Sequence, residues 1–339
     1  MNEKSKLIND NDLATIVLCT DLGIKNRKLL KPLSTLEWSD FVRELISNKM
    51  QPKDIFNDNV QDILITLKIN NSFIERVVNL LKRSANVSLE LNEYFNKGIY
   101  VITRSNPRFP RHIKEKLKDR TPPVLFYAGN LELCNDDCIA FVGSRKITPK
   151  IESTTKSLAS VVVDSGYTIV SGGAKGIDFI SENSCLENGG KAISIVSDSL
   201  ETRIIRKDIR NYISASKLLL ISLASPNSRF SVINAMNRNK CIYSLSEYSF
   251  VIHSTLKKGG TWNGAVEAIN HSLSNVVVLD DLDQESGNYA LITKYKASKA
   301  TLVNIQSEGL DVFLASINEK KEVPKLNSKE KKPKQMQLF

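Results

Sequence analysis

A chain of 339 residues, 41% of them hydrophobic, can bury one main core and a smaller second core, so its composition is that of a globular protein. No apolar run approaches the roughly 18 residues needed to cross a bilayer, and we expect a cytoplasmic protein that does not span a membrane. The net charge of +10 favours a polyanionic partner but does not distinguish DNA, RNA and anionic lipid.

Helical patterns dominate the first part of the chain. Apolar residues recur at intervals of three and four in "VQDILITL" (60–67) and in "NSFIERVVNLLKRSANVSLELNEYF" (71–95). Polar segments such as "NKMQPKD" (48–54) separate these patterns. The sequence therefore predicts a small helical domain over residues 1–97.

Strand patterns begin near residue 98, with "GIYVITRSNPRFP" (98–110) and "PPVLFYAGN" (122–130). From residue 138 onward, helical patterns alternate with short apolar runs, namely "IAFV", "YTIV", "AISIV", "LLLIS", "SFVIH" and "VVVL". Continuous apolar strands of this kind are typical of a parallel sheet covered on both faces. We predict a doubly wound α/β domain with a mainly parallel sheet over residues 98–318.

The composition changes again at the end of the chain. Segment 319–339 contains seven lysines and three glutamates, with few apolar residues before its last positions. So little apolar surface cannot offset the entropy of ordering, and we expect a disordered lysine-rich tail.

Three glycine-containing loops follow predicted strands. In an open parallel sheet, ligands bind at the carboxyl ends of the strands, where glycines allow close approach to a phosphate and Lys or Arg supplies the counter-charge. Each loop alone is equally well explained as a structural turn, but three basic loops on one rim favour an anion site. The loops are "VGSRKITP" (142–149), "SGGAKGID" (171–178) and "KKGGTWNGA" (257–265).

Cations and aromatic residues mix in "SRFSVINAMNRNKCIYSLSEYSF" (228–250). Such a mixture suits a nucleic-acid single strand, because phosphates need charge and unpaired bases stack on aromatic rings. A solvated helix end, with Phe230 and Tyr243 in the core, explains the segment equally well.

Two common kinds of site are not indicated. None of the loops reads GxGxxG, so a dinucleotide-binding dehydrogenase is not expected. The five cysteines are scattered and lack the paired spacing of a zinc site, so we expect reduced thiols and no metal.

The order of these segments resembles the DNA-processing protein A (DprA/Smf) family. The resemblance depends on "ITRSNPRFP", "PPVLFYAGN", "IAFVGSRKITP", "YTIVSGGAKGID", "MNRNKCIYSLSEYSFVIHS" and "KGGTWNGAVE", which follow the family's order and approximate spacing. It covers residues 100–302. The segment "KPLSTLEWSDFVREL" (31–45) is more loosely similar to the family's preceding helical domain, of the sterile-alpha-motif or helix-hairpin-helix kind.

This resemblance implies an extended Rossmann-like domain that binds single-stranded DNA, forms a homodimer and hands DNA to a RecA-type recombinase, without catalysis or a cofactor. It leaves the pathway open among transformation, recombination, repair and defence against mobile DNA. Residues that match the family's motifs or lie in the same loops are candidate DNA-phosphate contacts: Gly143, Ser144, Arg145, Lys146, Ser171, Gly172, Gly173, Lys175, Gly176, Arg238, Asn239, Lys240, Lys258, Gly259, Gly260 and Thr261.

The chain departs from the family's pattern at three places. The loop "KGGTWNGA" differs from the serine- and glycine-rich form of better-known members, which indicates a divergent branch. The segment "DFISEN" stands where an alanine-histidine pair is common. No segment after residue 307 is long enough for the winged-helix domain that many members carry.

Two alternative functions use the same loops. A nucleotide phosphoribohydrolase would place Glu267 downstream of the glycine-glycine-threonine sequence, although its companion arginine motif is missing and Glu267 fits a helix surface equally well. A sensor of a small nucleotide would need an effector domain, and the sequence supplies none.

The last five residues, "QMQLF" (335–339), resemble the short peptide by which many bacterial proteins dock on the DNA polymerase sliding clamp. Such peptides use a side-chain amide for orientation and an apolar pair for a pocket, and they work on a flexible tether. We expect Gln335, Leu338 and Phe339 to make the clamp contacts. The alternative is that the apolar pair folds back on its own domain or forms a dimer contact.

Overall fold

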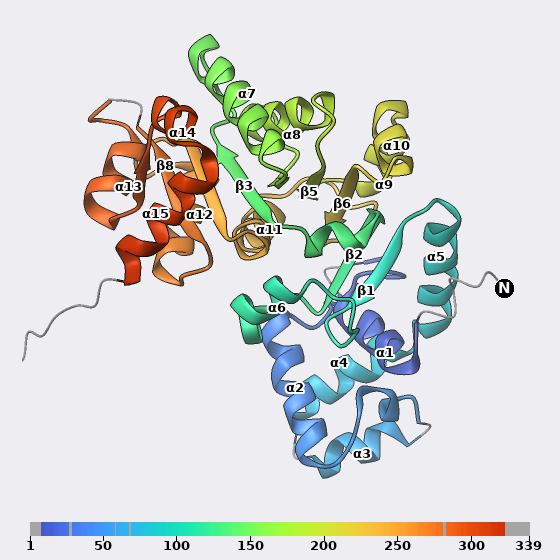
Figure 1. Cartoon of the computed structure of the whole chain (residues 1–339). Helices are drawn as coiled ribbons and strands as arrows, with labels where there is room; N and C mark the ends of the chain where they lie inside the picture. The colour runs from blue at the N-terminus through green and yellow to red at the C-terminus, as the bar shows by residue number, and fades with distance from the viewer. Residues whose placement is uncertain (1–7, 27–28, 58, 68, 281–282, 323–339) are drawn as a thin grey trace, which may run out of the picture.

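The structure is a computed structural model that describes residues 8–26, 29–57, 59–67, 69–280 and 283–322. These residues form a group of helices followed by one nine-stranded sheet, in the order β1-β2-β6-β5-β4-β3-β7-β8-β9 (Figure 1). The strands are β1 (Tyr100–Thr103), β2 (Val124–Gly129), β3 (Cys138–Gly143), β4 (Thr168–Ser171), β5 (Ala192–Val196), β6 (Leu218–Ser222), β7 (Tyr248–His253), β8 (Asn275–Leu279) and β9 (Ser298–Ala300).

The sheet is parallel from β6 to β9, and β1 and β2 extend it as an antiparallel edge. Starting at the central strand β3, the chain first builds β4, β5 and β6 on one side and then β7, β8 and β9 on the other. The strand order therefore reverses between β3 and β7, which is where ligands bind in doubly wound sheets. The predicted fold class, a Rossmann-like and mainly parallel α/β sheet, is confirmed.

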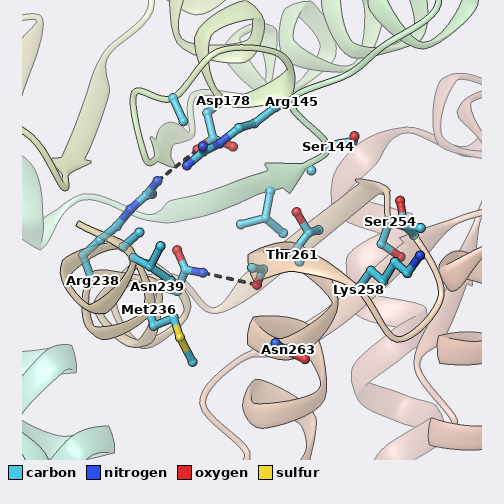
Figure 2. Close-up of a pocket in the computed structure, with 18 of the residues that line it drawn as sticks. Ser144, Arg145, Asp178, Met236, Arg238, Asn239, Ser254, Lys258, Thr261 and Asn263 are labelled. Atoms are coloured by element: carbon cyan, nitrogen blue, oxygen red, sulfur yellow. Dashed lines mark hydrogen bonds and ion pairs between the residues drawn. The ribbon is translucent and has the colours of Figure 1, made fainter. Parts of the chain in front are cut away.

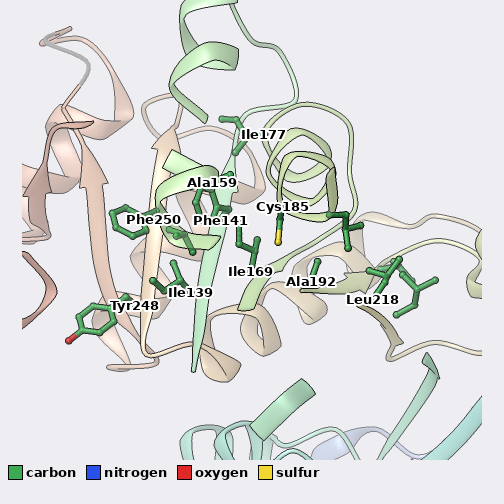
Figure 3. Packing of buried hydrophobic residues seen from close by; sticks show 14 of the residues in the cluster. Ile139, Phe141, Ala159, Ile169, Ile177, Cys185, Ala192, Leu218, Tyr248 and Phe250 are labelled. Carbon is green, nitrogen blue, oxygen red and sulfur yellow. The ribbon is translucent and has the colours of Figure 1, made fainter. Parts of the chain in front are cut away.

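Two helical layers cover the sheet because its strands are apolar on both faces. In β3, for example, Phe141 packs into one layer and Ala140 into the other. Figure 3 shows Phe141 and Phe250 on neighbouring strands, with Ala159 of the covering helix α7 beside Phe141. One layer contains α7 (Pro149–Asp164), α8 (Ile177–Glu187), α9 (Leu200–Ile204), α10 (Lys207–Ser214), α14 (Leu302–Glu308) and α15 (Leu310–Glu322). The other contains α6 (Arg111–Leu117), α11 (Val232–Leu245), α12 (Gly259–Asn270) and α13 (Gly287–Tyr295).

The N-terminal helices have a core of their own but share one helix with the sheet. On α1, Ala14 and Leu18 pack into the helical core, whereas Ile16 and Val17 pack into the core of the sheet. The expected boundary at residues 97 and 98 falls in the turn before β1. Because α1 contributes to both cores, the division into two domains stays a prediction. The helices are α1 (Asp10–Cys19), α2 (Thr35–Ser47), α3 (Val60–Thr66), α4 (Asn71–Leu81) and α5 (Ser84–Asn96), with a short 3-10 helix, η2 (Pro52–Ile55).

The C-terminal end differs in part from the expectation. Helix α15 continues to Glu322, beyond the residue at which we expected the tail to begin, because Phe313, Leu314 and Ile317 anchor the helix on the sheet. The rest of the expected tail, with Gln335, Leu338 and Phe339, lies outside the described residues. No helix among the described residues is long and apolar enough to cross a membrane. Within the same part of the chain, no three His, Cys, Asp or Glu side chains gather as metal ligands would.

Candidate nucleic-acid interface

The three glycine loops lie at the carboxyl ends of neighbouring strands. The first follows β3, the second follows β4 and the third follows β7, and β3 pairs in parallel with both β4 and β7. Because parallel strands end at the same edge, the loops lie side by side on one rim of the sheet. The structure therefore agrees with the prediction that the three loops share one rim.

A pocket of about 460 Å³ opens where the strand order reverses (Figure 2). The first loop, the third loop and α11 form most of its wall. Asn239 on α11 ties the third loop in place, because its side-chain amide donates to the carbonyl oxygen of Gly260 at 3.2 Å. The candidate contacts that line this pocket are Gly143, Ser144, Arg145, Arg238, Asn239, Lys258, Gly259, Gly260 and Thr261.

The second loop packs directly against the first loop. Gly176 has φ of +86°, and a Cβ added there would lie 2.7 Å from the Cα of Arg145. A Cβ on Gly143 would lie 2.9 Å from the Cβ of Ile177. The amide of Ile177 donates to the carbonyl oxygen of Ser144 at 3.3 Å. The glycines are thus required where the two loops pack against each other, since any side chain would separate them.

Arg238 forms the floor of the pocket. It projects from α11, only 4% of it is exposed, and its Nη2 lies 3.4 Å from Oδ2 of Asp178. A Cβ on Gly172 would overlap the guanidinium, so the second loop has a glycine where the arginine passes. Burial raises the pKa of Asp178, and the charge of Arg238 opposes that shift. Nε of Arg238 has no hydrogen-bond partner among the described residues, which leaves a buried donor for an anion.

Two further cationic features face the pocket from its edges. The guanidinium carbon of Arg145 lies 5.1 Å from the ring centre of Phe230, within cation–π range. Lys258 precedes α12 as its N-cap and makes no capping hydrogen bond with its side chain. The first amides of α12 therefore face the pocket without a side-chain cap, and the positive end of the helix dipole favours an anion there.

Apolar side chains stand exposed beside these cations. Phe230 is 47% exposed and Met236 48%, and both line the pocket together with Val232. Of the two aromatic residues considered in the sequence, Tyr243 is buried in the core and Phe230 is not. Sequence reasoning missed Val232 and Met236, although apolar residues three and four positions apart just before an arginine offered a signal.

Some candidate residues lie on the rim but outside the pocket. Lys146 and Lys175 are exposed on the first and second loops and do not line it. Ser171 is fully buried, and its hydroxyl donates to the carbonyl oxygen of Phe141 at 3.0 Å. Ser171 thus joins β4 to β3 within the sheet and cannot touch a ligand without local unfolding.

Gly173 also has a supporting position. Its amide donates to Oε1 of Glu182 at 2.8 Å, and its carbonyl oxygen accepts from Nη2 of Arg203 at 2.8 Å. Burial, reinforced by the nearby Asp178, raises the pKa of Glu182 to about 7. The second loop is thus fixed by a buried carboxyl group that titrates near neutral pH.

Lys240 lies apart from the other members of its sequence segment. Its Nζ lies 3.3 Å from Oε1 of Glu267 on α12, and Arg120 lies 3.7 Å from the same oxygen. Neither Lys240 nor Glu267 lines the pocket at the end of β3. This arrangement gives Glu267 two cationic partners away from the glycine loops, which disfavours its role as a catalytic residue there.

The fold and this pocket define a doubly wound α/β protein with a candidate anion site on the rim where the strand order reverses. Residues 100–310 match the family model described as DNA recombination-mediator protein A, and the chain belongs to that family. The resemblance found in the sequence is thereby confirmed.

Relatives of known name support the same assignment. Protein Smf of Synechocystis sp. is 27% identical over 221 residues, which cover 64% of this chain and 53% of the relative. DNA processing protein DprA of Streptococcus pneumoniae is 32% identical over 142 residues, covering 41% of this chain and 49% of the relative. The chain thus spans about half the length of these curated relatives.

Two solved structures share the fold. The X-ray structure of DprA from S. pneumoniae has a TM-score of 0.65 at 21% identity and covers 89% of this chain and 98% of its own. DNA processing protein A from Helicobacter pylori, whose structure is described by its single-stranded DNA binding mode, has a TM-score of 0.51 at 22% identity. It covers 66% of this chain and 96% of its own.

Proposed function

We propose that this protein binds single-stranded DNA along the rim formed by its three glycine loops, as a non-enzymatic protein of DNA processing. The observation that carries the proposal is the pocket at the reversal of strand order. Its lining combines the cations Arg145, Arg238 and Lys258 with the exposed side chains of Phe230 and Met236. The binding mode named for the similar protein from H. pylori supports it.

The chemistry of the pocket suits an unpaired strand better than a duplex. The cations would neutralise phosphates, the amides of α12 would donate hydrogen bonds to them, and the apolar side chains would contact the faces of bases. In a duplex those faces are stacked inside the helix, and only phosphates and base edges are accessible. We therefore propose binding without strong sequence preference.

Titrations of single- and double-stranded DNA at several salt concentrations test this function. Wild-type protein should prefer the single strand. Arg145→Gln should reduce the slope of log affinity against log salt by roughly 0.7, the value for one lost phosphate contact on a single strand. Lys191→Gln is the control for the loss of one surface cation, because Lys191 precedes β5 at the opposite ends of the strands, where it pairs with Asp136 at 3.0 Å. Equal slopes for all three proteins would remove Arg145 from the interface.

A sensor of a small nucleotide is a second candidate. The spare donor of Arg238 and the amides of α12 could bind the phosphate of a mononucleotide in the same pocket. Competition separates the two functions: a mononucleotide that displaces DNA at micromolar concentration would favour the sensor. Displacement only by oligonucleotides would favour the DNA-binding protein.

The proposed partners extend beyond DNA. From the family resemblance we propose that the protein protects single strands, forms a homodimer and delivers DNA to a RecA-type recombinase. We also propose that Gln335, Leu338 and Phe339 dock on the sliding clamp. Deletion of residues 335–339 should abolish capture of the protein by immobilised clamp and leave DNA binding intact. Equal capture with and without these residues would contradict the docking role.

A further inference from the structure

Helix α11 separates two pockets. Its Ala235, Met236 and Asn239 face the pocket described above, whereas Asn234, Asn237 and Lys240 face a second one of about 440 Å³. Residues three apart lie on one side of a helix, so the three polar residues form a row along α11. Lys240, which the sequence grouped with Arg238 and Asn239, belongs to this second pocket.

The second pocket lies between the sheet and the N-terminal helices. Besides the row on α11, it is lined by Ser34 and Leu36 at the start of α2 and by Arg120 at the end of the short 3-10 helix η3 (Lys118–Arg120). The side chains of Lys240 and Arg120 are 30% and 37% exposed. The pocket therefore offers two accessible cations and two amide side chains, which are the groups that contact a phosphate backbone.

Helix α11, which separates the two pockets, also carries exposed apolar side chains. Met236 is 48% exposed, Ile233 is 71% exposed, and both project from the first half of α11. A helix with its side chains is only about 10 Å across, so a strand needs few nucleotides to cross it. Apolar side chains on such a crossing suit bases, while the pockets on either side suit phosphates.

We propose that a single DNA strand continues from the first pocket across α11 into the second, where Lys240 and Arg120 contact its backbone. This inference rests on the proposed function and extends the binding site to the junction with the N-terminal helices. The carboxylate of Glu267 then competes with the DNA phosphates, because it pairs with Lys240 at 3.3 Å and with Arg120 at 3.7 Å. The strand must share or displace those ion pairs to bind.

The length of the DNA tests the proposal. Oligothymidylates from about 4 to about 16 nucleotides span the site sizes of single-strand-binding modules. The double variant Lys240→Gln, Arg120→Gln should bind the short strands as wild type does. On the long strands it should bind more weakly, with the salt slope reduced by up to about 1.4 for two lost contacts. Lys191→Gln is the control for the loss of a paired surface cation.

A second variant is expected to strengthen DNA binding, which misfolding would not do. Glu267→Gln removes the competing carboxylate and should strengthen binding of long strands at low salt, with short strands unchanged. Its control is Asp136→Asn, which makes the same charge change beside Lys191 at the opposite ends of the strands. Equal effects on short and long strands, or no effect of either change, would overturn the second contact region alone. Wild-type protein that binds no strand of any length would overturn the proposed function with it.

Discussion

The buried ion pair between Arg238 and Asp178 allows a quantitative test of how the site is built. Arg238→Met keeps much of the apolar stem but leaves the Asp178 carboxylate buried without its cation. Breaking a buried pair in this way costs about 3 to 5 kcal/mol, because a charge remains without a partner. We expect a loss of about 3 kcal/mol in the free energy of unfolding, and weaker DNA binding because the pocket loses its floor.

The pH dependence identifies the cause of that loss. Burial already raises the pKa of Asp178, and removal of Arg238 takes away the main opposing influence. In the variant, Asp178 therefore keeps its proton in the native state at pH values where the unfolded state has released it. The free energy of unfolding falls as pH rises from the unfolded-state pKa of Asp178 to its raised native-state pKa. The defect should be smaller at about pH 5 than at about pH 8.

Urea unfolding, followed by the fluorescence of the two buried tryptophans, Trp38 and Trp262, measures both effects. Adding Asp178→Asn to Arg238→Met should restore part of the stability at the higher pH, since an unpaired buried amide costs about 1 to 3 kcal/mol, less than an unpaired buried charge. The reasoning would be refuted by a single variant as stable as wild type, or by a defect of equal size at both pH values.

Three further predictions follow from the loops and the pocket. Gly176→Ala should destabilise the protein by about 1 to 3 kcal/mol more than Gly98→Ala in thermal unfolding, because both positions have positive φ but only the first is crowded. Glu182→Gln should flatten the fall in stability that wild type shows as pH rises from about 4.5 to about 7, because the raised pKa makes the native state hold the extra proton. Phe230→Ala should weaken binding of single-stranded DNA by about 1 to 3 kcal/mol in a fluorescence titration, and Phe56→Ala, an exposed phenylalanine among the N-terminal helices, should not.

Each of these predictions has a clear contrary outcome. Equal destabilisation by the two alanine substitutions would show that backbone strain, and not the contact between loops, explains the glycine. An unchanged pH profile in Glu182→Gln would assign the titration to another group. Equal binding by the two phenylalanine variants would remove Phe230 from the interface.

The strands and the rim were accessible from the sequence because both depend on local patterns. Apolar runs identified β3 to β8, and each glycine loop followed one of them. Strand β9 was missed, since its sequence "SKA" has a single buried residue, Ala300, and its strand character comes from pairing with β8. Local patterns thus predict strands whose own sequence is apolar, and they miss a strand that forms only by pairing with a neighbour.

The different partners of neighbouring side chains on α11 could not be predicted from their consecutive positions in the sequence. Arg238, Asn239 and Lys240 are consecutive, but each residue turns a helix by about 100°. Arg238 therefore points to Asp178, Asn239 to the third loop and Lys240 to Glu267. The partners come from α8 and α12, so only the tertiary structure assigns the three side chains to different surroundings.

The shared helix α1 has a consequence for any attempt to dissect the molecule. Ile16 and Val17 fill space beneath the sheet, while Ala14 and Leu18 fill space among the other N-terminal helices. Cutting the chain just before β1 would leave a hole under the sheet and strip the helices of a packing partner. Shortened versions meant to isolate either half should therefore be less soluble and more easily digested by proteases than the intact protein.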